Sequence, residues 1–547
     1  MWSRFVHSPP PIRGPFRTDD AARAVYAESA GVLQLVPRAV AVPLDADDVV
    51  TLLRWAATER VPIVPRGSGS SMGGGAVGDG VIVDCSRLLA RQAIDREHRT
   101  IWVESGVLRR DVEHAANAVG LRFPVDPSSG TFATIGGMAS TNAAGPRTLA
   151  FGAMRRWVEA AACVFADGSR ATIRRGAPLP SGVPALDRWS EVRDAIRIAA
   201  AALPAPRVRK ESSGYGVHDF AASGELLDLL VGSEGSLALF TSLELRLTDV
   251  PSATASVLAA FPSLERSVAG AALAREAGAT ACELLDRTFL DVARSAQALP
   301  VPDDAEAVLL IELEGDAAHG TEEVRSRARA LAAACEGNGA TGVLVGLDAE
   351  SEETLWALRH AASPILSRLD PNLKSMQVVE DGCVPPQRLG DYVRGVRSAL
   401  VASRLRGVIF GHAGDAHVHV NALVDVRDED WCDRVRLLFH NVVALTSALG
   451  GTLAGEHGDG RWRTPALDQL WPAAALALFE RIKAIFDPAG ILNPGVKVRP
   501  LASDLFARIK YDPALPPLPE EARAVLSRVE RERAYDVPRL EMLSSPE

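Results

Sequence analysis

The sequence lacks the cysteine spacing of a metal–thiolate site. Its 6 cysteines are scattered singly along 547 residues, and no C-x-x-C occurs. Isolated thiols are typical of a reducing compartment, and an iron–sulfur cluster needs grouped cysteines. The sequence therefore predicts a cytoplasmic protein with no Cys-ligated Fe–S cluster in this chain, and it leaves open a peripheral position at a membrane.

Long apolar runs and a positive charge excess are also missing. No stretch approaches the roughly 20 apolar residues of a membrane span, and the first residues lack the apolar stretch of a secretory signal. The net charge of −10 gives no general attraction to nucleic acid or to an anionic membrane surface. The basic run Arg207–Lys210 is interpreted as a solvated face or an anion contact. We expect neither a membrane span nor a nucleic-acid partner.

The chain is long enough for two or more globular domains. It is 47% apolar and 23% charged, which is typical of a soluble globular protein. Short β-rich segments alternate with helices from Pro37, and Pro251 marks a predicted boundary. The predicted divisions are an N-terminal extension at 1–36, an α+β domain at 37–249, a second α+β domain at 250–497, and a linker with a helical tail at 498–547.

The second domain shows a β-α-α-β rhythm. Strands are predicted at 252–261 and 307–314, with helices at 264–276, 321–334 and 353–367. The tail helix predicted at 520–535 is amphipathic and could dock on the body or on another subunit, so a homo-oligomer stays open.

Five potential ligands and bases crowd into two Gly-rich segments, although the chain has only 11 His. The segments read G-H-A-G-D-A-H-V-H-V-N at 411–421 and G-E-H-G-D-G-R at 455–461. A hairpin is predicted here, with His417, His419 and Asn421 on one face and Val418 and Val420 towards the core. Imidazole and carboxylate together suit Zn, Mn or Fe and indicate Lewis-acid chemistry, although individually hydrogen-bonded histidines remain an alternative.

A glycine-rich loop at 65–75 lies between predicted strands at 61–64 and 81–84. Consecutive small residues form an anion-holding concavity, and Arg66 adds a charge that suits a diphosphate. Met72 breaks a G-x-G-x-x-G pattern, and no G-K-[ST] follows. Two further Gly-rich segments, at 124–145 and 232–236, favour a large cofactor lying along the backbone over a flexible loop with no ligand.

These motifs carry a family resemblance. The order P-R-G-S-G-S-S, D-P-S-S-G-T…T-I-G-G-M-A-S-T-N-A-A-G and G-S-E-G-S resembles the FAD domain of the vanillyl-alcohol oxidase/p-cresol methylhydroxylase superfamily. V-E-D-G-C-V-P, the two His segments and F-D-P-A-G-I-L-N-P-G-V-K resemble the branch of D-lactate dehydrogenase, glycolate oxidase flavin subunit and D-2-hydroxyglutarate dehydrogenase. The resemblance covers about 37–497. It implies an α+β fold, with a two-subdomain FAD-binding domain of the vanillyl-alcohol oxidase type and a C-terminal α+β cap or substrate domain.

The resemblance also implies site residues. Neither His nor Cys lies within 65–75, so FAD is expected to be non-covalent. The metal, Zn or Mn, is expected on His412, His419 and Glu456, with His457 as the base and the role of His417 open. The residues implied for FAD are Arg66, Gly67, Ser68, Gly69, Ser70, Ser71, Asp126, Gly136, Gly137, Ser140, Asn142, Gly145, Gly235 and Asn493, and those implied for substrate are Arg359, Ser363, Lys374 and Asn421.

The leading hypothesis is FAD-dependent oxidation of a D-2-hydroxy acid, of the D-lactate or D-2-hydroxyglutarate type, to the 2-oxo acid. Electrons would leave to a separate acceptor, which could be a quinone, an electron-transfer protein or an Fe–S partner. The alternative is a redox-neutral flavoenzyme transferase resembling alkyl-dihydroxyacetonephosphate synthase. A catalytically silent subunit is disfavoured by the intact metal and base motifs. An oxidase of sugars or phenols is disfavoured because it would not require the His/Glu set.

Overall fold

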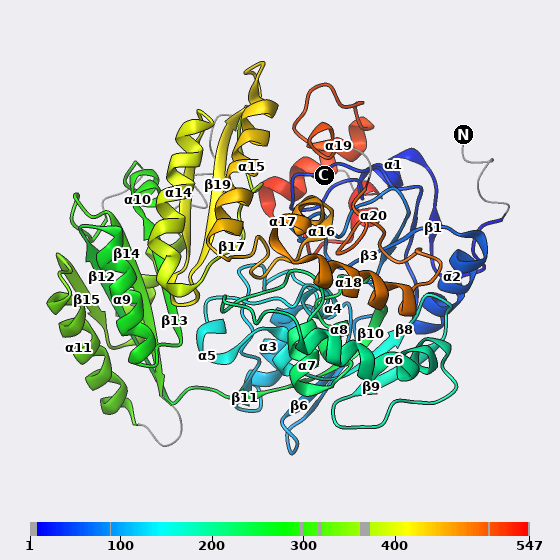
Figure 1. The fold of residues 1–547 in the computed structure, drawn as a ribbon, viewed down its shortest axis with the longest axis horizontal. Coiled ribbons are helices and arrows are strands. Elements are labelled where there is room, and N and C mark those ends of the chain that lie inside the picture. The colour runs from blue at the N-terminus through cyan, green and yellow to red at the C-terminus, as the bar shows by residue number, and fades with distance from the viewer. Residues whose placement is uncertain are drawn as a thin grey trace.

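The computed structural model describes residues 8–87, 89–295, 299–315, 320–360, 372–501 and 504–544. The N-terminal half lies on the right in Figure 1, and the C-terminal sheet with its helices lies on the left. Within the described ranges, no helix is both long and apolar enough to cross a membrane.

The first sheet has four strands in the order β1-β2-β4-β3, and β2, β4 and β3 run parallel. Helix α2 (Ala46–Glu59) follows β2, and the side chain of Asp45 accepts hydrogen bonds from the N–H groups of Asp47 and Asp48 at its start. The strands are β1 (Phe16–Arg17), β2 (Ala39–Ala41), β3 (Ile63–Arg66) and β4 (Val81–Asp84).

The second sheet has five antiparallel strands in the order β5-β6-β10-β8-β9. Its apolar core surrounds the fully buried side chain of Trp189 on α6 (Pro184–Ala201). The strands are β5 (Gln92–Asp95), β6 (Thr100–Glu104), β8 (Val158–Val164), β9 (Arg170–Arg174) and β10 (Leu239–Arg246), and the accompanying elements are α3 (Arg109–Asn117), β7 (Leu121–Arg122), α4 (Ile135–Thr141), α5 (Thr148–Phe151), α7 (Val217–Ser223), α8 (Leu227–Leu230) and β11 (Thr248–Asp249).

The third sheet has eight strands, in the order β15-β12-β14-β13-β18-β19-β16, with β17 pairing to β19. One apolar cluster places helices α9, α11, α14 and α15 on one face, and another places α10 and α12 on the opposite face. The strands are β12 (Ala253–Phe261), β13 (Ala281–Asp286), β14 (Ala307–Gly315), β15 (Gly342–Gly346), β16 (Leu373–Met376), β17 (Gly382–Cys383), β18 (Arg406–His412) and β19 (His417–Asp425). The helices are α9 (Leu264–Glu276), α10 (Arg287–Arg294), α11 (Thr321–Gly337), α12 (Ala349–His360), α14 (Leu389–Ala402) and α15 (Trp431–Ala448).

The predicted β-α-α-β rhythm is wrong, because β13 and β15 interrupt it. Strand β13 was missed because it is short and has the fully buried Glu283 at its centre, which breaks its apolar pattern. The predicted His hairpin is confirmed. His412 pairs across it with His417, Val418 and Val420 are fully buried in the core, and the side chains of His417 and His419 lie on the other face.

The chain then returns to the N-terminal half. Residues of α18 (Ala473–Phe486), among them Phe479 and Phe486, join the apolar core around Trp189. The aromatic rings of Phe486 and Trp189 lie 5.6 Å apart. The short helices α16 (Gly460–Arg463) and α17 (Leu467–Leu470) lead into α18. The second half of the chain therefore contributes both to the third sheet and to the apolar core of the second sheet.

The C-terminal segment packs within the chain. Helices α19 (Glu520–Glu532) and α20 (Arg539–Ser544) lie beside α1 (Asp20–Ala24) and share an apolar cluster with the first sheet (Figure 1). The predicted tail helix is confirmed but ends at Glu532, because Arg533 adopts a left-handed conformation with φ 55°.

Candidate active site

A cavity of about 1240 Å³ lies between the N-terminal half, the third sheet and the C-terminal segment. This volume exceeds that of a usual small-ligand pocket, so it has room for a dinucleotide-sized cofactor. Asn142, Gly145 and Asn493 are not part of its wall. The wall contains Arg66, Gly67, Ser68, Gly69, Ser70, Ser71, Asp126, Gly136, Gly137, Ser140 and Gly235 of the predicted cofactor residues, and His412, His419, Glu456, His457, Arg359, Lys374 and Asn421 of the other predicted residues.

Arg66 supports the glycine-rich loop from behind. Its guanidinium donates hydrogen bonds to the carbonyls of Glu28 at 2.9 Å, Ala76 at 3.2 Å and Tyr26 at 3.3 Å. Gly69 has φ +79°, and a Cβ there would lie 2.3 Å from a guanidinium nitrogen of Arg66. The arginine therefore fastens the loop to the N-terminal extension, a contact that the sequence did not indicate.

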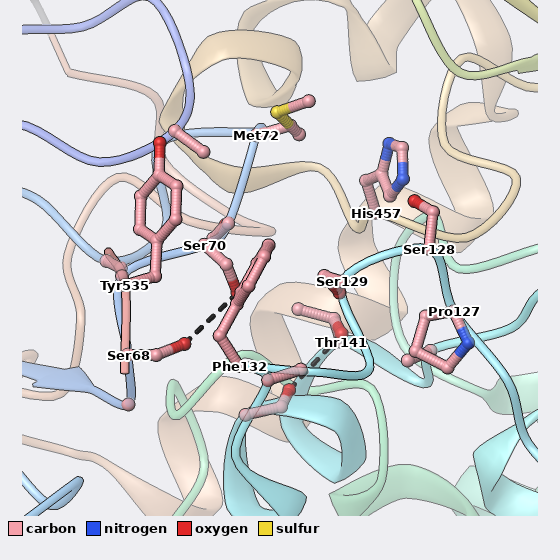
Figure 2. A pocket seen from close by; sticks show the side chains of 18 of the residues that line it. Ser68, Ser70, Met72, Pro127, Ser128, Ser129, Phe132, Thr141, His457 and Tyr535 are labelled. Carbon is pink, nitrogen blue, oxygen red and sulfur yellow. Dashed lines mark hydrogen bonds between the residues drawn. The ribbon is translucent and has the colours of Figure 1, made fainter. Parts of the chain in front are cut away.

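The other glycines let the Gly-rich segments pack on one another. A Cβ at Gly67 would lie 2.2 Å from Thr134 Oγ1, and a Cβ at Gly145 would lie 2.3 Å from the carbonyl oxygen of Asp126. Along the wall, Ser68 Oγ and Ser70 Oγ share a hydrogen bond of 3.2 Å (Figure 2). Ser71 Oγ is buried with no partner among the described residues. A backbone cradle with an unpaired hydroxyl fits a ligand rich in oxygen acceptors, such as a diphosphate.

Asn142 and Asn493 act behind this wall. Asn142 ends α4 in a left-handed conformation, and its side-chain oxygen accepts the N–H of Arg155 at 2.8 Å. The side-chain amide of Asn493 donates to the carbonyls of Glu234 at 2.7 Å and Gly75 at 3.0 Å. Asn493 therefore joins segments that form the wall.

His412, His419 and Glu456 converge at the third sheet. His412 Nε2 and His419 Nε2 lie 3.4 Å apart, and each lies 3.4 Å from Glu456 Oε1. The three residues are only 3%, 8% and 7% exposed. Two imidazole nitrogens and one carboxylate oxygen facing a common point make a ligand set for a divalent cation, with room left for substrate.

The Nδ1 atoms of His412 and His419, which face away from Glu456, each lie within hydrogen-bond distance of another oxygen atom. His412 Nδ1 lies 2.5 Å from Glu283 Oε1, and His419 Nδ1 lies 2.8 Å from the carbonyl oxygen of Glu380. Such partners orient a ligating imidazole. Burial would raise the pKa of Glu283, but His412 and Arg359 outweigh it and lower the pKa to about 2. Glu283 is therefore a permanent anion behind the cluster.

Arg359 pairs with the same carboxylate. Its Nε lies 2.7 Å from Glu283 Oε2, and its guanidinium lies 4.7 Å from the ring centre of Phe410. Arg359 lines the cavity but is tied to a buried anion, which the sequence did not indicate. The only sequence signal for Glu283 was an acidic residue within an apolar run. Ser363, the predicted neighbour of Arg359, lies outside the described residues.

Lys210 fixes the other oxygen of Glu456. Lys210 Nζ lies 2.9 Å from Glu456 Oε2 and 3.0 Å from the carbonyl oxygen of Gly145, and its side chain is 1% exposed. Burial would raise the pKa of Glu456, but Lys210 and His412 hold it well below its usual range. The basic run at 207–210 is thus not only a solvated face, because it supplies a buried cation to the cluster.

His457 lies on the cavity side of Glu456. Its Nδ1 lies 2.7 Å from Glu380 Oε2, and its Nε2 lies 3.6 Å from Glu456 Oε1. Burial would lower the pKa of His457, but Glu380 and Asp381 raise it to about 9 in the protein without a cation. The carboxylates around the cluster therefore create a negative field that favours a bound cation.

His417 is enclosed behind the cluster. Its Nε2 lies 2.8 Å from Asp381 Oδ1, its Nδ1 lies 3.8 Å from Glu456 Oε2, and the side chain is fully buried. Burial lowers the pKa of His417 to about 3, so the ring is neutral. It is not part of the cavity wall.

The C-terminal segment also lines the cavity, which no sequence motif indicated. Tyr511 lies between two lysines, with Lys374 Nζ 5.1 Å and Lys510 Nζ 5.0 Å from its ring centre. Its hydroxyl donates to Glu530 at 2.6 Å. The residues that the segment contributes are Lys510, Tyr511, Ser527, Glu530, Arg531, Arg533 and Tyr535.

Comparisons with known proteins agree with this geometry. The family profile described as the FAD binding domain matches residues 37–174, and that of the FAD linked oxidases, C-terminal domain, matches residues 250–496. The glycolate oxidase subunit GlcD of Bacillus subtilis (strain 168) is 31% identical over 492 residues, covering 88% of this chain and 94% of that protein. The chain belongs to the FAD-linked oxidase family.

More distant matches support the same fold. A D-2-hydroxyglutarate dehydrogenase of Pseudomonas putida is 27% identical over 522 residues, and the match covers 90% of this chain but only 51% of that protein. A solved alkyldihydroxyacetonephosphate synthase superposes with a TM-score of 0.60 at 16% identity, covering 90% of this chain and 88% of that one. The predicted α+β FAD-binding fold with a C-terminal oxidase domain is confirmed, and the protein is an FAD-linked oxidoreductase.

The cluster generates a prediction about metal content. We expect about one divalent ion per chain, and we expect His412→Ala and Glu456→Gln to lose it, because each removes one of the three side chains that converge at 3.4 Å. Metal analysis of the purified proteins measures this. His114→Ala, which removes an exposed histidine on α3, is the control and should retain the ion. Full metal content in both cluster variants would contradict the ligand set.

A second prediction concerns Glu283. Glu283→Gln should weaken metal affinity by roughly 10–100-fold, because the amide no longer holds His412 as an anion does. A competition titration with a chelating indicator gives the affinity. Glu352→Gln changes another carboxylate of the same half, one that accepts hydrogen bonds from Thr254 and Ser256, and should leave the affinity unchanged. Equal affinities in all three proteins would show that Glu283 does not orient the ligand.

Proposed function

We propose that the protein oxidises a D-2-hydroxy acid to the 2-oxo acid, with non-covalent FAD as the hydride acceptor. The observation that carries the proposal is the convergence of His412, His419 and Glu456 at 3.4 Å on the wall of a cavity that the FAD-binding loops also line. Relatives named glycolate oxidase subunit and D-2-hydroxyglutarate dehydrogenase support this substrate class. We assign residues 37–249 to FAD and 250–497 to metal and substrate.

The two cofactors would supply the chemistry that side chains lack. FAD accepts a hydride, and a divalent ion, Zn or Mn, lowers the pKa of a coordinated hydroxyl. We assign the ion to His412, His419 and Glu456. The FAD contacts we assign are those predicted residues that line the cavity, while Asn142, Gly145 and Asn493 support them from behind.

His457 is proposed as the base that removes the hydroxyl proton. A base must be neutral, and the pKa of about 9 means that His457 is mostly protonated near neutral pH when no cation is present. An adjacent divalent ion opposes this, because its positive charge disfavours the imidazolium. Glu380 holds Nδ1, so Nε2 is left to face Glu456 and the cavity.

We also propose a chemical class for the distal end of the substrate. Lys374 and Asn421 line the cavity and offer an ammonium and an amide, which suits a second carboxylate. Arg359 lines the same cavity but already pairs with Glu283. A dicarboxylic 2-hydroxy acid fits this wall better than D-lactate does.

Electrons from the reduced flavin would then pass to a separate acceptor. The transferase alternative has the fold in common but needs no such acceptor.

The proposal predicts the reduction of bound flavin. Anaerobic addition of a D-2-hydroxy acid should bleach the yellow flavin, and His457→Ala should slow this by roughly 10²–10⁴-fold while FAD and metal stay bound. Stopped-flow absorbance measures the rate, with D- and L-enantiomers compared. Chelation should abolish bleaching without releasing FAD. If no 2-hydroxy acid bleaches the flavin of a metal-loaded protein, the redox-neutral alternative replaces this proposal.

A further prediction separates substrate classes. Lys374→Met should raise the KM for D-2-hydroxyglutarate much more than the KM for D-lactate, because only the former has a distal carboxylate. Steady-state kinetics with both substrates measures the ratio. Arg388→Met, on an exposed part of the same half outside the cavity wall, is the control. Equal changes for both substrates would remove Lys374 from recognition of the distal group.

A further inference from the structure

Part of the cavity wall comes from residues beyond the two family matches, which end at 174 and 496. The C-terminal segment contributes seven of them, which are Lys510, Tyr511, Ser527, Glu530, Arg531, Arg533 and Tyr535. Neither the FAD-binding motifs nor the His/Glu cluster accounts for them. Their chemistry combines aromatic rings with cations.

The segment that carries Arg533 and Tyr535 is firmly held. Val525 and Val529 of α19 pack in one apolar cluster with Val64 and Ile82 of the first sheet, and Tyr535 packs against that cluster. Val64 lies in β3, which leads directly into the glycine-rich loop at 65–75. The segment is therefore fixed next to the loop to which we assign the FAD diphosphate.

Two aromatic rings and a cation meet at this edge of the cavity. The ring centres of Phe132 and Tyr535 lie 5.1 Å apart, and the guanidinium of Arg533 lies 5.2 Å from the ring centre of Phe132. Among the described residues, no carboxylate lies within ion-pairing distance of Arg533, and its side chain is exposed. An unpaired guanidinium beside two rings suits a ligand with a flat base and an anionic group.

The position within the cavity indicates which half of the cofactor would meet these residues. Figure 2 shows Tyr535, Ser68 and Phe132 on one side, and His457 well apart from Tyr535 on the other. Because the reacting flavin ring must lie beside His457, the far half of the cofactor extends towards Ser68 and Tyr535. That half is a nucleoside diphosphate.

We propose that Phe132, Arg533 and Tyr535 form a subsite for the ADP half of the cofactor, in which the rings contact the base and the guanidinium pairs with the diphosphate. This inference rests on the FAD cofactor of the proposed function. The C-terminal segment is then part of the cofactor site, and FAD retention depends on residues outside both matched domains.

The test measures ligand binding by the full-length apo-protein, apart from activity. Arg533→Gln should weaken ADP binding by roughly 10–100-fold, the range for one charge-assisted hydrogen bond, and should leave adenosine binding unchanged. Tyr535→Ala should weaken both, whereas Tyr535→Phe, which keeps the ring, should bind like the wild type. Isothermal titration gives these affinities, and the flavin content after gel filtration should fall in the same order.

Arg523→Gln is the matched control, because Arg523 is exposed on α19, the helix that Arg533 directly follows, but is not part of the cavity wall. It should bind ADP like the wild type, and the thermal midpoints of all apo-proteins show that they fold. If Arg533→Gln and Tyr535→Ala both bind ADP within twofold of the wild type, the proposed subsite is wrong, and the proposed function is unaffected. A wild-type chain that binds neither FAD nor ADP would overturn the proposed function as well.

Discussion

The carboxylate of Glu456 joins the two halves of the molecule. One oxygen pairs at 2.9 Å with Lys210 from the N-terminal half, and the other lies 3.4 Å from both His412 and His419 on the third sheet. A buried carboxylate is costly unless it is paired, and removing one partner of such a pair typically costs about 3–5 kcal/mol. Because the two halves share this one anion, the geometry of the cluster depends on how the halves are packed.

The loop that carries Glu456 is held from both sides. Asp381 accepts the backbone N–H groups of Glu456 at 3.1 Å and His457 at 2.9 Å. Farther along, Glu234 accepts the N–H of Asp459 at 2.8 Å and pairs with Lys497 at 3.0 Å. Short, buried, charge-assisted contacts of this kind hold ligands within the narrow tolerance that a reactive site needs. The conformation of the loop is therefore preorganised.

Local patterns in the sequence predicted much of this structure. The hairpin was predictable because the alternation of His417, Val418, His419 and Val420 is a property of one strand. The contacts of Glu283 and Lys210 were not predictable, because they join residues 129 and 246 positions apart. No local signal distinguishes a buried lysine from a solvated one. The glycine motifs are also local patterns, and most of the residues predicted from them line the cavity. Several of these glycines, such as Gly67 and Gly145, are required because the segments pack closely on one another.

The cluster shared by the first sheet and the C-terminal helices bears on the order of folding. Val40, Val64 and Ile82 of that sheet are covered by Ala522, Val525 and Val529, which are synthesised more than 400 residues later. A nascent chain with only the N-terminal half outside the ribosome has Ala24, Val25 and Tyr26 to pack on that face but lacks the residues of α19, so part of the apolar face is exposed. Such long-range closure slows folding and exposes partly folded species to aggregation. The N-terminal half is thus a fragment whose expression alone should require a chaperone.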